Sequence, residues 1–145
     1  MRQKISLVYK NLDEVISEEL VWAELLDNGF YKVDNIPFYA PNVAYGDIIS
    51  VEKEDDKFYF EDLIEASGNS TVQIVFFDKS KEKEIMHNLD ILGCSWEGIE
   101  GGGYCALDIP LEIDYKNIQF FLNQNSDLLD YREACLSETH SEQIM

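Results

Sequence analysis

The chain has 145 residues, of which 46% are hydrophobic and 28% charged, a balance typical of one globular domain with a real core. Its 29 acidic residues outnumber its 11 basic residues and give a formal net charge of −18, which argues against partners such as nucleic acid or an anionic membrane. No apolar run approaches the roughly 18 residues that span a membrane, and three cysteines without tight spacing do not form a disulfide framework, so we expect a cytoplasmic protein.

Residues 1–66 are expected to be mainly β. The pattern predicts a short strand at 5–10, a loop-like acidic stretch at 11–19, and further strands within 20–26 and 30–40. Residues 46–66 read as strand, turn and strand, because apolar residues alternate on both sides of a polar turn at 54–57. These short strands predict a bent antiparallel sheet or a partial β-barrel.

Residues 67–137 have the texture of a strand-helix-strand-helix unit. Strands are predicted at 71–77 and 103–113, and helices at 81–93 and from Asp114 onward, with a last helical turn or two at 128–136. The polar end, 138–145, is expected to be loose. The whole chain, 1–145, is therefore predicted to be a single α+β domain.

No motif indicates catalysis, a metal or a cofactor. The three cysteines and the two histidines, His87 and His140, lack zinc-like spacing, and no nucleophile elbow is present. The glycine-rich stretch 97–105 has no basic residue and precedes a strand instead of a helix, so it predicts a flexible connection and not a phosphate loop. We expect neither catalytic nor metal-binding residues.

The stretch NIPFYAPNVAYGDIIS (35–50) is predicted to be a rigid structural loop. Its prolines stiffen the chain, and Gly46 permits a bend before Asp47, whose carboxylate can accept local backbone N–H groups. No base, nucleophile or metal ligand accompanies it. The residues assigned to this structural role are Asn35, Pro37, Tyr45, Gly46 and Asp47.

The same region resembles a known family. The segments Trp22–Glu24, Tyr31–Phe38 and Tyr45–Asp47, together with Leu129–Leu136 near the end, are similar to a bacterial family of small proteins described as a domain of unknown function. That resemblance implies no established activity. By analogy, the small size of these proteins is similar to that of immunity proteins that accompany bacterial toxins.

The densest compact set of acids flanks the turn at 54–57. Because a hairpin tip projects from its sheet, these carboxylates are expected to be exposed and able to reach a basic partner. A solvated turn without a binding role is the alternative. The residues predicted to bind a partner are Glu52, Glu54, Asp55, Asp56, Glu61 and Asp62.

Charge and the lack of catalytic motifs favour an immunity protein over an enzyme. It would bind and neutralise a basic toxin domain, such as a nuclease of the contact-dependent growth inhibition type, by electrostatically steered association. An acidic regulatory or nucleic-acid-mimic module is the alternative, followed by a small carboxylate-dependent enzyme. We expect a monomer or weak dimer without metal or cofactor.

Overall fold

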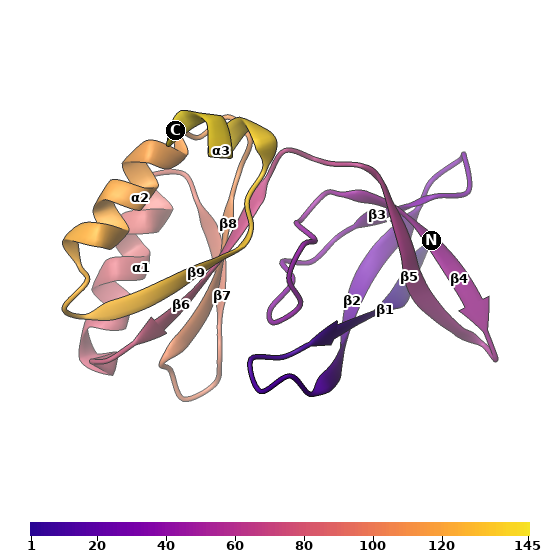
Figure 1. Ribbon diagram of the computed structural model, residues 1–145, viewed down its shortest axis with the longest axis horizontal. Helices are drawn as coiled ribbons and strands as arrows, with labels where there is room; N and C mark the ends of the chain where they lie inside the picture. Colours follow the sequence, from indigo (N-terminus) through magenta and orange to yellow (C-terminus); the bar gives the residue numbers. More distant parts are fainter.

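The computed structural model describes residues 1–145 and shows an α+β protein with two β-sheets beside each other (Figure 1). The strands are β1 (Arg2–Lys10), β2 (Ile16–Leu25), β3 (Tyr31–Val33), β4 (Ile48–Glu54), β5 (Lys57–Glu65), β6 (Ser70–Phe76), β7 (Ser95–Gly98), β8 (Tyr104–Ile109) and β9 (Leu129–Cys135). The helices are α1 (Glu82–Ile91), α2 (Tyr115–Gln124) and α3 (Glu138–Gln143). The predicted α+β class with a bent N-terminal sheet is confirmed.

Strands β1–β5 form a small closed ring. Neighbouring strands are antiparallel, except that β5 meets β1 in parallel, at Ile5 opposite Phe58, which closes the ring. Successive strand residues point to opposite faces, so Ile5 and Leu7 of β1 and Val21 and Ala23 of β2 all reach the interior of the ring. This small core is one of two in the molecule.

The β4–β5 pair is bent by extra residues on β5. Val51 pairs with Phe60, whereas its neighbour Ser50 pairs with Asp62, so Glu61 is left without an opposite residue. A second register shift falls between Ile48 and Ile49. Such bulges bend a strand and increase its twist, which allows five short strands to curve into a ring.

The second sheet has the order β7-β8-β6-β9, and all its pairs are antiparallel. With α1 after β6 and α2 after β8, this is the interleaved βαββαβ pattern of ferredoxin-like folds. Both helices lie on one face of the sheet (Figure 1), where Leu89 and Leu122 join Ile74 and Leu107 in the larger core. None of the helices is long and apolar enough to cross a lipid bilayer.

The structure corrects the expected βαβα order of residues 67–137. Residues 128–136, predicted to be helical, contain β9, and β7 was not predicted. Leu129 and Tyr131 pack on the helix-covered core while Asp130 and Arg132 alternate with them, so the period of two that defines a strand is present. Pairing of β9 with the central strand β6 decides the outcome over local helix propensity.

The C-terminal segment 138–145 was expected to be loose but contains α3. Ser137 caps the helix by accepting the N–H of His140 at 3.2 Å. His140 is fully buried, and its Nε2 lies 3.1 Å from the carbonyl oxygen of Pro110 and 3.0 Å from that of Ile113. Because both are acceptors, Nε2 carries the proton and Nδ1 accepts from the Ser70 hydroxyl at 2.6 Å. The segment is therefore docked on the end of the second sheet.

Candidate functional site

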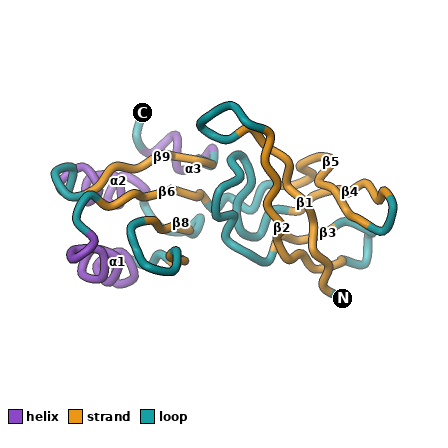
Figure 2. Tube along the Cα trace, turned by 90° about the horizontal axis from the view of Figure 1, so that it is seen from below, coloured by secondary structure: helices purple, strands orange, loops and turns teal.

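The loop between β3 and β4, residues 34–47, lies between the two sheets and contacts both. In Figure 2 loop segments lie between the ring and the second sheet. On the ring side, the Glu19 carboxylate of β2 accepts the backbone N–H groups of Phe38 at 2.6 Å, Tyr39 at 2.9 Å and Ala40 at 2.8 Å. A carboxylate with three such donors fixes the backbone of the loop. Glu19 was missed in the sequence because it lies in a stretch expected to be loop.

On the other side, the loop contacts the face of the second sheet that carries no helix. The Gln73 amide of β6 donates to the Tyr39 carbonyl oxygen at 3.0 Å, and the Tyr104 hydroxyl of β8 donates to that of Phe38. The Asn42 N–H donates to the Ala134 carbonyl oxygen of β9 at 2.9 Å. The loop thus sets the relative position of the two sheets.

Asp47 holds the end of this loop. It is buried, and its two carboxylate oxygens accept the N–H groups of Ala44 and Ser67, each at 2.9 Å. Gly46 has φ +86°, and a Cβ there would lie 3.1 Å from the Ser67 Cβ, so this position favours glycine. Asn35 accepts the Trp22 N–H at 2.5 Å.

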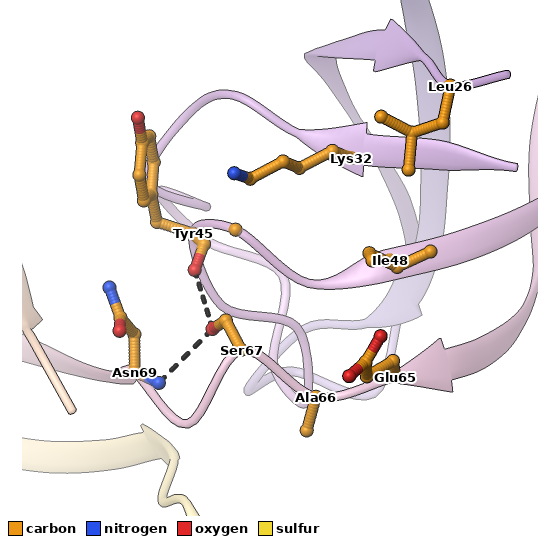
Figure 3. A pocket seen from close by; sticks show the side chains of 9 residues that line it. Leu26, Lys32, Tyr45, Ile48, Glu65, Ala66, Ser67 and Asn69 are labelled. Atoms are coloured by element: carbon orange, nitrogen blue, oxygen red, sulfur yellow. Dashed lines mark hydrogen bonds between the residues drawn. The ribbon is translucent and has the colours of Figure 1, made fainter.

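The other two predicted loop residues differ in exposure. Pro37 is buried, whereas the Tyr45 side chain is exposed. Tyr45 borders an open hollow of about 520 Å³ at the junction of the ring with the β5–β6 connection. Figure 3 shows the Tyr45 carbonyl oxygen accepting a hydrogen bond from the Ser67 hydroxyl. The side chains of Lys32, on β3, and Glu65, on β5, line the same hollow. The five predicted structural residues therefore lie along one loop, but only some are enclosed.

A second hollow, of about 350 Å³, lies between the loop and the edge of the second sheet, and three carboxylates line it. Asp108 of β8 is the buried one, held by the Asn69 amide at 3.3 Å. The pKa of Asp108 is raised to about 6, chiefly by burial and also by the charges of Glu112 and Asp47, against the lowering effect of the Asn69 hydrogen bond. The sequence feature that could have identified Asp108 as a candidate site residue is a single acid within an otherwise apolar strand. The other two carboxylates that line this hollow belong to Asp34 and Glu97.

The β4–β5 hairpin lies at the far end of the ring from the helices (Figure 1). All six acids predicted to bind a partner are exposed, namely Glu52, Glu54, Asp55, Asp56, Glu61 and Asp62. Asp55 has φ 49° and Asp56 has φ 65°, both left-handed. Lys57 pairs with Glu18 of β2 at 2.6 Å, so its charge is directed away from the tip. The hairpin acids and the structural loop are separate features.

The cysteine thiols are enclosed. Burial raises the pKa of Cys94 and of Cys105 to about 12, and that of Cys135 to about 11. Such thiols carry little thiolate at neutral pH and are weak nucleophiles. No three histidine, cysteine or carboxylate side chains come together in a way that could hold a metal ion. The glycine-rich stretch 97–105 contains the end of β7, the connection at 99–103 and the start of β8.

Comparisons with known proteins identify a family. Residues 19–130 match the family described as "Domain of unknown function (DUF4265)". A solved structure similar to this chain is that of a hypothetical protein from Neisseria gonorrhoeae, with 32% sequence identity, a TM-score of 0.86, and coverage of 94% of this chain and 96% of that one. A search of curated proteins found no match. This chain therefore belongs to the DUF4265 family, a domain of unknown function.

Proposed function

We propose that this chain is an immunity protein that binds and neutralises a basic toxin domain through the β4–β5 hairpin. The observation that carries the proposal is the tip itself, where Asp55 and Asp56 both adopt left-handed backbone angles in solvent. Asn-Gly or Asp-Gly suits such a two-residue turn better. A sequence that departs from local preference at an exposed, charged tip is typical of a functional surface.

The charges around the tip favour a basic partner. Lys57 is engaged by Glu18 on the neighbouring strand, and Lys53 lies 3.9 Å from Asp56. Glu52, Glu54 and Asp55 form no ion pair within the chain. A partner rich in lysine and arginine, as a nuclease toxin is, would supply the missing countercharges and be steered by the net charge of −18.

Protection of growing cells tests the proposal. The probe is a basic toxin domain found by gene neighbourhood or by pull-down with this chain, expressed in cells together with the chain or its variants. The chain should restore growth, and Asp55→Lys with Asp56→Lys should not. Reversal of two exposed acids on α1, Glu84→Lys with Asp90→Lys, changes net charge equally and should still protect. Failure of the unaltered chain to protect contradicts an immunity role.

The second candidate is a carboxylate-dependent enzyme, which Asp108 favours because its pKa of about 6 lies near neutrality. A base in such a role needs access to a substrate, and Asp108 borders a hollow shared with Asp34 and Glu97. An enzymatic role predicts that Asp108→Asn abolishes function while the hairpin variant retains it. If the unaltered chain protects growing cells, protection that is lost in Asp108→Asn and retained by the hairpin variant would favour the enzyme, and the reverse result would favour the immunity protein.

A further inference from the structure

A hollow of about 270 Å³ lies where the β1–β2 hairpin, the 34–47 loop and the helix-free face of the second sheet meet. Tyr9 comes from the ring, Tyr39 from the loop, and Gln73, Tyr104 and Arg132 from the second sheet. The proposed toxin-binding function does not use this hollow. Its side chains combine hydrogen-bond donors with aromatic rings.

Arg132 is held in place without a charged partner. Its Nε donates to the Gln73 side-chain oxygen at 3.0 Å, and the Gln73 amide in turn donates to the Tyr39 carbonyl oxygen at 3.0 Å. Neither Nη atom forms a hydrogen bond or ion pair within the chain. The other arginine, Arg2, pairs with Asp34 at 3.1 Å. In a chain with 29 acids, an oriented guanidinium with open donors fits the two oxygens of a carboxylate.

The tyrosines add a planar surface and further donors. Tyr39 stacks on Tyr104 with ring centroids 5.4 Å apart and planes 15° from parallel, and 43% of Tyr39 stays exposed. The hydroxyls of Tyr9 and Tyr39 have no hydrogen-bond partner in the chain, whereas that of Tyr104 is used by the loop. A flat group resting near Tyr39 would therefore place its acid among free donors.

Charge decides which anion suits the hollow. The net charge of −18 opposes every anion, and a doubly charged phosphate is opposed about twice as strongly as a monocarboxylate. Asp13 also lines the hollow and adds to this bias. We propose that the hollow binds a small planar monocarboxylate, with the acid on the Arg132 guanidinium and the planar group against Tyr39.

Titration followed by two-dimensional NMR of the whole chain tests this site, with benzoate as the probe. Benzamide has nearly the same shape without the charge, and inorganic phosphate is the competing anion. Benzoate should bind saturably with a Kd of about 1 mM or tighter, shifting the amide signals of Tyr39, Tyr104 and Arg132. Benzamide and phosphate should each bind at least tenfold more weakly.

Two arginine variants supply the matched comparison. Arg132→Gln should weaken benzoate at least tenfold, whereas Arg2→Gln makes the same charge change at the other arginine and should leave the Kd unchanged. Thermal melting of each variant confirms that it is folded. Equal binding of benzoate and benzamide, retained benzoate binding by folded Arg132→Gln, or no saturation with benzoate by about 10 mM would each overturn the proposal. None of these results depends on whether the chain neutralises a toxin.

Discussion

The N–H of Ser67 donates to Oδ1 of Asp47 at 2.9 Å, which ties the connection between the two sheets to the loop that lies between them. The other oxygen of Asp47 accepts the N–H of Ala44, so both carboxylate oxygens are used. Asp47 is 3% exposed, and water cannot easily replace either bond. A structural role for this aspartate follows from its place in the fold.

Asp47→Asn is expected to destabilise the fold. An amide has one oxygen, so one of the two N–H groups would face the NH₂ group and lose its acceptor, at a cost of about 1–3 kcal/mol. Urea unfolding of the variant measures the change in the free energy of unfolding. Asp27→Asn, in an exposed turn, is the matched control and should change little. Equal stability of Asp47→Asn and the unaltered chain would show that the carboxylate is not needed by the loop.

Asp108→Asn is expected to stabilise the protein at neutral pH. The folded-state pKa of Asp108 is raised to about 6 from the usual value of an aspartate, about 4, so its contribution to stability is full below about 4 and is lost as pH rises through about 6. A neutral residue of the same size avoids that loss, worth about 1–3 kcal/mol above pH 6.

The check is to measure the free energy of unfolding of the unaltered chain and of Asp108→Asn between pH 4 and 8. The advantage of Asp108→Asn should grow through pH 5–6 and vanish near pH 4. A variant that is less stable at every pH would mean that the charged carboxylate contributes a favourable interaction in the folded state.

Docking of the C-terminal segment depends on His140. His140→Ala removes a fully buried ring and leaves the Pro110 and Ile113 carbonyl oxygens without their donor. We expect a loss of about 2–4 kcal/mol in the free energy of unfolding. His87→Ala, on the exposed side of α1, should change it by less than about 0.5 kcal/mol. Similar small effects at both histidines would contradict the docked arrangement.

The hairpin turn should become more stable if its tip is made conventional. Asp55→Asn with Asp56→Gly keeps the left-handed angles but uses residues that adopt them readily. The melting temperature should rise by roughly 2–5 °C, while binding to a basic partner weakens because two carboxylates are lost. Calorimetry checks the first effect. A lower melting temperature would mean that the two aspartates stabilise the turn through their side chains.

Much of the fold follows from local patterns, and the remainder depends on contacts between distant residues. The β4–β5 hairpin was predicted because apolar residues alternate on both sides of a polar turn. Strand β9 was mistaken for helix because its alternation is short and its pairing with β6, which decides the outcome, cannot be read from the segment itself. The buried state of His140 was missed because its partners Ser70, Pro110 and Ile113 are 27 or more residues away.

The candidate sites show the same division. Exposure of the acids at the hairpin tip could be predicted, because the turn and its charges are contiguous in the sequence. The roles of Glu19 and Arg132 could not, because each depends on a loop or a strand that only the folded chain brings close. Sequence patterns therefore locate charged surfaces better than they locate hydrogen-bonded hollows.

The central claim is that the β4–β5 hairpin meets a basic partner, and association kinetics test it most directly. The rate constant for binding a basic toxin domain, found by gene neighbourhood or by pull-down with this chain, is measured by stopped flow across a salt series. At low salt, Asp55→Lys with Asp56→Lys should slow association at least tenfold, with the difference shrinking as salt rises. Glu84→Lys with Asp90→Lys should slow it far less. Equal rates for the two double variants at low salt would contradict the account.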